Sequence, residues 1–450
     1  MQKLHVVGGG LAGSEAAWQA AIRGIKVELY EMRPNKQTGA HISGDLAELV
    51  CSNSFGSMLV DRAGGLLKEE LTRLGSMLLS CAYETSVPAG GALAVDRLAF
   101  AKLVTEEISS HPNITIIRDE IEGIITQPTI IATGPLTSKK LSNAIQQLTG
   151  SENLFFYDAI SPIINADSID FNIAYRASRY GRGDRVVGDY LNCPLRKEEY
   201  LKFVHELVHA ERIKLHEFED ELEKGVRAGY HKYFEGCLPI EILAQRGIDA
   251  LAYGPMRPVG LVDPRTGTRP YAVVQLRQDN LAATLYNLVG FQTNLKFNEQ
   301  KRIFQMIPGL GQASFERFGH MHRNTFLNSP SLLKPSLQFH IRDDLFFAGQ
   351  ITGVEGYLGN IATGLLAGIN AVNYIMSRPV ITFPKETMLG ALCYYITHAD
   401  EENFQPMKAN FGILPPLSDS GIKGKRQRAK AFSTRALRIQ KEYLDSINFA

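Results

Sequence analysis

The stretch LHVVGGGLAGSEAAWQAAIRG, residues 4–24, decides the fold of this chain. Its first residues, Leu4–Val7, form a short apolar run typical of a buried strand, and three consecutive glycines follow. The alanine-rich segment after them predicts a helix that ends near Gly24. Residues 27–31 predict a second strand, and the two strands of such a strand–helix–strand unit pair in parallel. The sequence therefore predicts an α/β fold with a Rossmann-like sheet.

The glycines after the first strand match the pattern Gly8-x-Gly10-x-x-Gly13. The first glycine of this pattern permits a tight turn, the second lets the backbone approach a pyrophosphate, and the third allows close helix packing. Glu31 closes the second predicted strand, where an acid binds the hydroxyl groups of an unphosphorylated ribose. The alternative is a tight turn that only packs, but the position of Glu31 favours a site for FAD or NAD.

Two later segments favour FAD over NAD. Residues 129–132 predict a strand that ends at Thr133-Gly134, and residues 345–348 predict another that ends at Gly349. They resemble the two further loops with which FAD-binding folds hold the adenine, the ribitol and the flavin. The predicted cofactor-binding residues are Gly8, Gly9, Gly10, Leu11, Ala12, Gly13, Glu31, Thr133, Gly134, Gly349, Glu355 and Gly356.

The sequence between these two ends has a different character. Residues 196–224 are periodic and rich in charge, which predicts one or two exposed amphipathic helices, and residues 225–310 predict loops and strands. We therefore expect three parts, which are an FAD-binding domain of residues 1–140 and 325–385, an α/β insertion domain of residues 141–324, and a C-terminal helical basic segment of residues 386–450.

Composition limits the class of protein. Of the 450 residues, 44% are hydrophobic and 21% are charged, which excludes a disordered or fibrous chain. No apolar stretch approaches the roughly 18 residues of a membrane span, so we expect a soluble, cytoplasmic protein without membrane contact. The net charge is only +1, so a polyanionic partner requires a local basic patch.

The last thirty residues offer such a patch, because no acid lies between Gly421 and Lys441. The run can neutralise several phosphates of an RNA, or it can remain a solvated tail, and the sequence favours neither interpretation. Its basic residues are Lys423, Lys425, Arg426, Arg428, Lys430, Arg435, Arg438 and Lys441.

Residues 205–209, HELVH, match the zinc motif H-E-x-x-H. In the extended motif a third histidine follows the second by six residues, whereas His216 follows His209 by seven. The surrounding lysines and glutamates predict a solvated helix face and not a dry cleft. We therefore predict no bound metal.

The five cysteines include no C-x-x-C pair, which predicts neither a zinc ribbon nor a disulfide framework. Cys51 and Cys237 lie among small and polar residues, in segments that a loop can expose. A thiolate there can add to C6 of a pyrimidine and later leave, which suits carbon–carbon chemistry. The alternative is that both, like Cys81, Cys193 and Cys393, are small buried side chains.

Several longer strings together resemble one known family. They are GGGLAGSEAAWQAA, LAELVCSNSF, GLLKEEL, VPAGGALAVDR, FEGCLPIE, GPMRPVGL, PYAVVQLRQDN, HRNTFLNSP, FAGQITGVEGY and NFGILPPL. Over nearly its whole length the chain resembles the folate- and FAD-dependent tRNA (uracil-5-)-methyltransferases, the TrmFO family. The GVEGYLGNIATGLLAG region is shared with the GidA/MnmG proteins, which are longer by a C-terminal domain.

The resemblance implies formation of 5-methyluridine at T-loop uridine 54 of tRNA. It implies 5,10-methylenetetrahydrofolate as the carbon donor, FADH2 as the reductant and NAD(P)H as the source of electrons for the flavin. Carried over to matching positions, it implies that Cys237 adds to uracil C6 and that Cys51 removes the C5 proton, although the two roles could be divided otherwise.

Some alternatives stay open at this point. The same chemistry on ribosomal RNA, a flavin oxidoreductase acting on a small metabolite, and a non-catalytic RNA-binding flavoprotein all fit part of the pattern. The NADPH or NADH preference and the oligomeric state are not fixed. Candidates for contact with the pterin are Gln275, Arg277 and Gln278 in VVQLRQDN, and His322, Arg323 and Asn324 in HRNTF.

Overall fold

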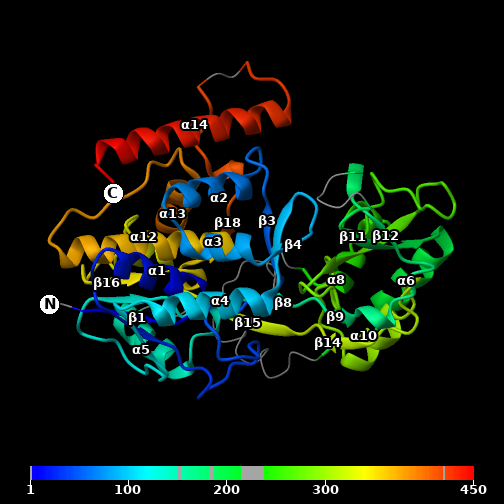
Figure 1. Cartoon of the computed structure of the whole chain (residues 1–450), viewed down its shortest axis with the longest axis horizontal. Coiled ribbons are helices and arrows are strands. Elements are labelled where there is room, and N and C mark those ends of the chain that lie inside the picture. The colour runs from blue at the N-terminus through cyan, green and yellow to red at the C-terminus, as the bar shows by residue number, and fades with distance from the viewer. Residues whose placement is uncertain (1–2, 151–153, 182–186, 214–237, 419–420, 450) are drawn as a thin grey trace.

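The computed structural model describes residues 3–150, 154–181, 187–213, 238–418 and 421–449, which form two lobes side by side (Figure 1). The larger lobe contains both ends of the chain, and we call it the nucleotide lobe. The smaller lobe is formed by the middle of the chain, and we call it the insertion lobe. Within the described ranges, no helix is both long enough and apolar enough to cross a membrane.

A parallel sheet in the order β16-β7-β1-β2-β6 forms the centre of the nucleotide lobe. Because β16 pairs with β7 and β7 pairs with β1, the two ends of the chain meet in one sheet. The predicted α/β fold with a Rossmann-like sheet is therefore confirmed. The strands are β1 (Leu4–Val7), β2 (Val27–Tyr30), β6 (Ile114–Ile117), β7 (Thr129–Ile131) and β16 (Leu345–Phe347).

Alternate residues of these strands face two different helical layers. Val6 belongs to the core under α1 and α12, whereas the neighbouring Val7 belongs to the core under α5. Helices α1 and α12 touch through their backbones, because a Cβ atom at Gly364 would lie 2.2 Å from the carbonyl oxygen of Ala12. The three helices are α1 (Leu11–Ile22), α5 (Lys139–Thr149) and α12 (Tyr357–Ile375).

A small three-stranded sheet in the order β3-β5-β4 lies where the nucleotide lobe meets the insertion lobe. The loop that carries Cys51 leads directly into β3. The strands are β3 (Ser54–Ser57), β4 (Ser86–Val87) and β5 (Ala92–Val95), and the helices around them are α2 (Ala63–Arg73), α3 (Met77–Glu84) and α4 (Arg97–Ser110).

An antiparallel sheet in the order β10-β11-β12-β13-β9-β14 forms the insertion lobe. In β12, Val274 and Leu276 belong to the apolar core under the helices, so Gln275 and Arg277 project from the opposite face of the sheet. The strands are β9 (Ile163–Asn165), β10 (Tyr175–Ala177), β11 (Tyr190–Leu195), β12 (Ala272–Gln278), β13 (Leu285–Leu288) and β14 (Phe315–Arg317).

One prediction for the insertion lobe is confirmed and one needs correction. Residues 197–209 form an amphipathic helix, as predicted within residues 196–224, and residues 214–237 lie outside the described part. The segment predicted as loops and strands also contains short helices, two of which have only five and four residues and so show no readable periodicity in the sequence. The helices are α6 (Lys197–His209), α8 (Ile240–Ala244), α9 (Ala250–Tyr253) and α10 (Phe297–Phe304).

Strands β8 (Leu154–Ala159) and β15 (Met321–Phe326) pair in antiparallel fashion and run between the two lobes (Figure 1). The C-terminal residues form α13 (Met388–His398) and α14 (Lys425–Ser446). Leu389 and Ala436 belong to the core of the nucleotide lobe, so both helices pack onto that lobe. The basic tail is therefore largely one helix, and α14 crosses the top of the lobe in Figure 1.

Candidate functional site

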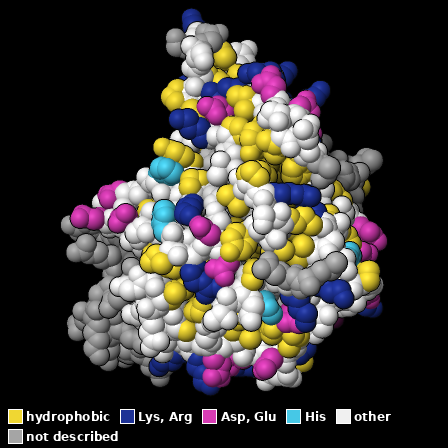
Figure 2. All heavy atoms as spheres, turned by 90° about the vertical axis from the view of Figure 1, so that its left-hand side faces the viewer, with side chains coloured by type: hydrophobic (Ala, Val, Ile, Leu, Met, Phe, Trp, Pro, Cys, Tyr) yellow, Lys and Arg dark blue, Asp and Glu magenta, His cyan; other side chains and the backbone are white. Residues whose placement is uncertain are grey.

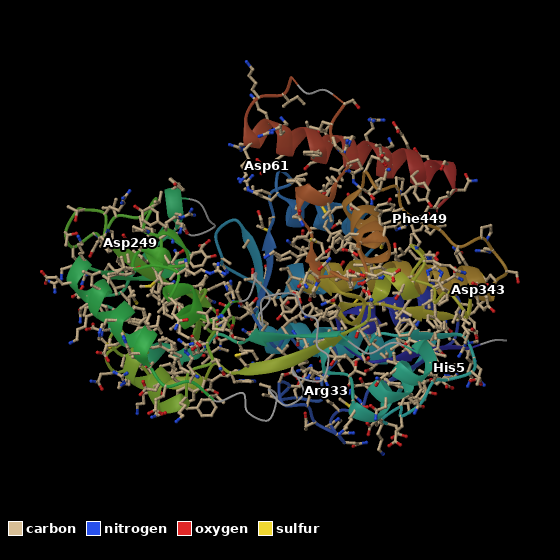
Figure 3. The ribbon with its side chains drawn as sticks, turned by 180° about the vertical axis from the view of Figure 1, so that it is seen from behind. His5, Arg33, Asp61, Asp249, Asp343 and Phe449 are labelled. Carbon is tan, nitrogen blue, oxygen red and sulfur yellow. The ribbon has the colours of Figure 1, made fainter. Side chains whose placement is uncertain are left out.

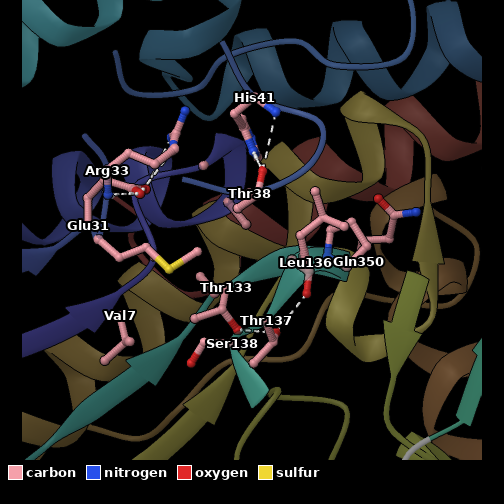
Figure 4. Close-up of a pocket in the computed structure, with 18 of the residues that line it drawn as sticks. Val7, Glu31, Arg33, Thr38, His41, Thr133, Leu136, Thr137, Ser138 and Gln350 are labelled. Carbon is pink, nitrogen blue, oxygen red and sulfur yellow. Dashed lines mark hydrogen bonds and ion pairs between the residues drawn. The ribbon is translucent and has the colours of Figure 1, made fainter. Parts of the chain in front are cut away.

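A pocket of about 990 Å³, counting its open mouth, lies at the carboxyl ends of β1, β2, β7 and β16 (Figure 4). Ligands of open α/β sheets bind at this edge. Of the predicted cofactor-binding residues, those in the pocket wall are Gly8, Gly10, Leu11, Ala12, Glu31, Thr133, Gly134 and Gly349. Gly9, Gly13, Glu355 and Gly356 do not line it.

The three motif glycines have three different surroundings. A Cβ atom at Gly13 would lie 1.8 Å from the carbonyl oxygen of Gly8, so this glycine lets α1 pack on the turn. Gly8 has a φ of +102°, and its Cβ position lies 2.7 Å from the carbonyl oxygen of Ala132. A Cβ atom at Gly10 would meet nothing within 4 Å, because this position faces the pocket. Gly10 is therefore the glycine at which a ligand can approach the backbone.

Glu31 is held firmly by its neighbours. Its carboxylate accepts hydrogen bonds from the backbone N–H of Gly9 at 2.9 Å and from Nε of Arg33 at 2.9 Å. Burial alone raises the pKa of Glu31, but the hydrogen bonds and charge of Arg33 outweigh it, so the pKa is lowered. The carboxylate is thus ionised and ready to accept hydrogen bonds from hydroxyl groups.

Arg33 is a pocket residue that the sequence analysis missed. It is 2% exposed and joins two acids, since Nη1 also lies 3.1 Å from a carboxylate oxygen of Glu48. In Figure 4, Arg33 and Glu31 lie on one side of the pocket, and Thr133 and Thr137 lie on the other. The signal in the sequence was an arginine two residues after the acid that ends the second strand.

The outer wall of the pocket is formed by a loop that contains His41 and Thr38 (Figure 4). The side-chain oxygen of Thr38 lies 2.6 Å from Nδ1 of His41. Burial, together with the charge of Arg33, lowers the pKa of His41 to about 4. The imidazole is therefore neutral at pH 7 and adds no charge to a pocket that holds ionised groups.

The fit of a flavin dinucleotide can be tested at Asn360, another residue of the pocket wall. Its Oδ1 atom is buried and has no hydrogen-bond partner among the described residues. A buried acceptor of this kind requires a donor, and a ligand with N–H or O–H groups in the pocket supplies one. The pocket also contains the open N-terminus of α1, which suits a pyrophosphate. The residues present therefore fit FAD.

Cys51 lies next to the pocket wall. The hydroxyl oxygen of Tyr357, a pocket residue, accepts hydrogen bonds from the backbone N–H groups of Cys51 at 3.1 Å and Ser52 at 3.0 Å. The hydroxyl group donates to the carbonyl oxygen of Ser52 at 2.8 Å. Burial raises the pKa of Tyr357, so the hydroxyl group stays protonated and can donate.

The other thiols separate into two groups. Cys237 lies outside the described residues, so its distance from Cys51 stays untested. Cys81, Cys193 and Cys393 are buried, and burial raises the pKa of each to about 12. These three are therefore protonated and unreactive at neutral pH.

One of the two strings proposed for pterin contact meets the Cys51 loop. Nε of Arg277 donates to the side-chain oxygen of Asn53 at 2.7 Å, and the backbone carbonyl of Gln278 accepts from Asn53 at 2.9 Å. Gln275 instead bonds Asn192 within the insertion sheet. In the second string Asn324 is buried, and the side chains of His322 and Arg323 lie outside the described part.

The HELVH segment lies on α6, where its side chains contact an arginine and one another. Glu206 forms an ion pair with Arg302 at 2.5 Å, and the rings of His205 and His209 are 4.5 Å apart. In the part of the chain that the structure describes, no group of three histidines, cysteines or acids could hold a metal ion. The absence of metal stays a prediction.

Comparisons with known proteins agree with this geometry. The family model for glucose inhibited division protein A matches residues 3–379. The methylenetetrahydrofolate--tRNA-(uracil-5-)-methyltransferase TrmFO of Anoxybacillus flavithermus is 54% identical over 445 residues, which cover 99% of this chain and 100% of the relative. The TrmFO protein of Enterococcus faecalis is 55% identical over 447 residues, again 99% and 100% of the two chains.

Among solved structures, GidA of Aquifex aeolicus has the same fold. It superposes with a TM-score of 0.69 at 16% identity, covering 98% of this chain and 73% of that chain. The identity is too low to carry more than the fold, but the sequence relatives span the full length. The chain therefore belongs to the glucose inhibited division protein A family and, within it, to the methylenetetrahydrofolate--tRNA-(uracil-5-)-methyltransferases TrmFO.

Proposed function

We propose that this protein methylates C5 of a uridine in tRNA, with methylenetetrahydrofolate as the carbon donor and FADH2 as the reductant. The observation that carries the proposal is the contact between the two parts of the site. Tyr357 lines the dinucleotide pocket and at the same time binds the backbone of the loop that carries Cys51. One tyrosine thus joins the wall of the cofactor pocket to the backbone of the loop that carries a thiol.

The reaction balances with these three substrates. The methylene carbon leaves N5 and N10 of the folate, so one C–H bond of the new methyl group and two folate N–H bonds must form. The C5 hydrogen that the uracil loses and two further hydrogens from the reduced cofactor account for these three bonds. FAD supplies the two-electron reduction when it is bound in its reduced form. The products are 5-methyluridine, tetrahydrofolate and FAD.

The chain's own residues bind, orient and exchange protons. The carboxylate of Glu31 and the open backbone at Gly10 hold the dinucleotide. The thiolate of Cys237 adds to uracil C6, which makes C5 nucleophilic, and Cys51 removes the C5 proton after the carbon has been transferred. The half-buried position of Cys51 beside the pocket supports its role near the reacting carbon.

Three finer points belong to the same proposal. NADPH or NADH reduces the flavin, because the reaction consumes one FADH2 in each turnover. The enzyme works in the cytoplasm, where its tRNA substrate and reduced thiols are found. The N-terminal half of α14 binds tRNA phosphates through residues such as Lys425 and Arg428, which form no ion pair within the described ranges.

Arg426 contributes less positive charge to the N-terminal half of α14 than the sequence suggested. Its Nε lies 2.9 Å from a carboxylate oxygen of Asp61, which partly neutralises it, and Figure 3 shows Asp61 beneath that end of α14. On the face seen in Figure 2, basic and acidic side chains are interspersed, in keeping with a net charge of +1. A phosphate backbone therefore requires the local basic run of α14.

The test is mass spectrometry of nucleosides after incubation with unmodified tRNA, methylenetetrahydrofolate and NADPH. We expect 5-methyluridine that depends on the folate and on the RNA. A parallel incubation with ribosomal RNA separates the two RNA classes. Flavin turnover that needs neither folate nor RNA would instead identify an oxidoreductase that acts on a small metabolite.

A further inference from the structure

The loop that carries Cys51 is fixed by two arginines, one on either side of the thiol. Two residues before Cys51, the carbonyl oxygen of Leu49 accepts a hydrogen bond from Nη1 of Arg97 at 3.0 Å. Two residues after it, the side-chain oxygen of Asn53 accepts from Nε of Arg277 at 2.7 Å. Between these points Tyr357 binds the backbone, so the loop has little freedom to move the thiol.

Arg97 connects the two lobes. It is the first residue of α4 in the nucleotide lobe, and its Nε lies 3.0 Å from both carboxylate oxygens of Asp279, which follows β12 in the insertion lobe. Asp96, next to it, caps α4 and also accepts from the backbone N–H of Leu281 at 2.8 Å. The position of the Arg97 guanidinium therefore depends on the insertion lobe.

Arg277 makes the second connection from the insertion lobe. It projects from the face of the insertion sheet that is turned away from the apolar core, opposite Asn287 on β13. Its partner Asn53 donates to the carbonyl oxygens of Val95 in the nucleotide lobe and Gln278 in the insertion lobe, at 2.9 Å each. Asn53 thus joins both lobes two residues from the thiol.

The contacts of Arg97 and Arg277 add little to the stability of the fold, because burying a guanidinium group requires its removal from water. Arg97 and Arg277 are 9% and 8% exposed, and removing such charges from water is expensive. Nη2 of Arg97 is also buried without a hydrogen-bond partner among the described residues. Buried ion pairs rarely exceed apolar packing in stability, and in some proteins they fix one geometry among several. A role in placing the loop accounts for this arrangement.

We propose that Arg97 and Arg277 are positioning residues that hold the Cys51 thiol in place across the junction of the two lobes. The proposal uses the proposed function only for the role of Cys51 in turnover. Lysine cannot replace either arginine fully, because an ammonium group is a point charge without the fixed fork of a guanidinium. That fork lets Arg97 bind a carboxylate and a backbone carbonyl group together, and lets Arg277 reach the side-chain oxygens of Asn53 and Asn287. Arg97→Lys and Arg277→Lys keep the charge and should release the loop.

Arg342 provides a matched control within the nucleotide lobe. It binds both carboxylate oxygens of Asp344, at 2.9 and 2.8 Å, and its Nη1 donates to the carbonyl oxygen of Ile125 at 3.1 Å. These are the same kinds of contact that Arg97 makes, but they lie at the turn before β16. Arg342→Lys should therefore leave the Cys51 loop unchanged.

The experiment measures how fast iodoacetamide alkylates each cysteine of the purified full-length protein, with mass spectrometry of the peptides. We expect Arg97→Lys and Arg277→Lys to accelerate alkylation of Cys51 severalfold. The buried thiols of Cys81, Cys193 and Cys393 report on general unfolding, and they should stay unreactive. In turnover, kcat should fall by about 10- to 100-fold with KM for tRNA unchanged, since small displacements of a reacting group cost that much.

The outcomes divide clearly. Unchanged alkylation of Cys51 in both variants, or unchanged kcat in both, overturns the positioning role. Acceleration of the buried thiols along with Cys51 overturns it as well, because the arginines would then serve stability alone. A wild-type protein that makes no 5-methyluridine contradicts the proposed function, and the alkylation rates then decide the positioning role by themselves.

Discussion

The dinucleotide pocket and the Cys51 loop lie side by side but are built in opposite ways. The floor of the pocket comes from the glycine turn and Glu31, which are close in sequence and bind each other through the backbone N–H of Gly9 and the carboxylate of Glu31. The Cys51 loop is held by Arg277 and Tyr357, which are more than two hundred residues away in the chain. A site made of neighbouring residues leaves a motif in the sequence, and a site made across lobes does not.

The largest expected effect concerns the two thiols. The wild-type enzyme should be trapped covalently on RNA that carries 5-fluorouridine, because that base has no C5 proton to lose. Cys237→Ala should abolish 5-methyluridine formation and should form no such adduct, because it lacks the thiolate that adds to C6. Cys51→Ala should also be inactive but should still form the adduct, as expected for a base. Denaturing gel electrophoresis of labelled RNA measures the adduct. The reverse pattern would exchange the two roles, and adducts in both variants would remove Cys237 from the mechanism.

The next largest effect separates two glycines of the same turn. Gly13→Ala places a methyl group 1.8 Å from a carbonyl oxygen, so it should destabilise the fold by about 3 kcal/mol or more. Gly10→Val points into the pocket and should leave the fold intact while blocking FAD. Thermal melting and flavin absorbance measure the two properties. Full FAD occupancy in a folded Gly10→Val protein would contradict the assignment of the pocket.

A smaller effect is expected on the pH dependence of stability, where two buried carboxylates differ, Glu31 in the pocket and Glu70 on α2. Glu31 has an arginine partner, whereas Glu70 binds the backbone N–H groups of Met388 and Leu389, and burial raises its pKa to about 7. The folded state then holds more protons than the unfolded state between pH 4.5 and 7, so stability falls as the pH rises through this range.

The size of this loss is up to about 3 kcal/mol, since one pKa unit is worth about 1.4 kcal/mol. Glu70→Gln should flatten the dependence of the melting temperature on pH in this range. The shift of Glu31 has the opposite sign, so its contribution is present above about pH 4.5 and is lost at lower pH. Equal pH dependence in wild type and Glu70→Gln would contradict the assignment to Glu70.

The smallest effect is expected at α14. Changing Lys425 and Arg428 to alanine should weaken tRNA binding and reduce the slope of log affinity against log salt by about one unit for each phosphate that the protein no longer neutralises. Arg426→Ala should change the slope less, because Asp61 already pairs with it. Filter binding at several salt concentrations measures the slope. If the double variant keeps the wild-type slope, the RNA lies elsewhere.

The sequence by itself determined the sheet, the glycine turn and Glu31. Their determinants are local, because apolar runs, glycine spacing and the strand-end position of an acid act over about thirty residues. The pairing of the two chain ends in one sheet also followed, since β16 and β1 both precede glycine loops. The shortest helices of the insertion lobe, α8 and α9, did not follow, because four or five residues show no periodicity in the sequence.

Only the tertiary structure decided what surrounds Cys51. Arg97 and Asp279 have no mark in the sequence, and Arg277 was predicted to contact the pterin, so nothing local identifies the three as supports of the Cys51 loop. Their meaning comes from burial, because a guanidinium removed from water must find carboxylate or carbonyl oxygens wherever the fold brings them. Contacts of this kind are set by the packing of the two lobes and not by any spacing along the chain.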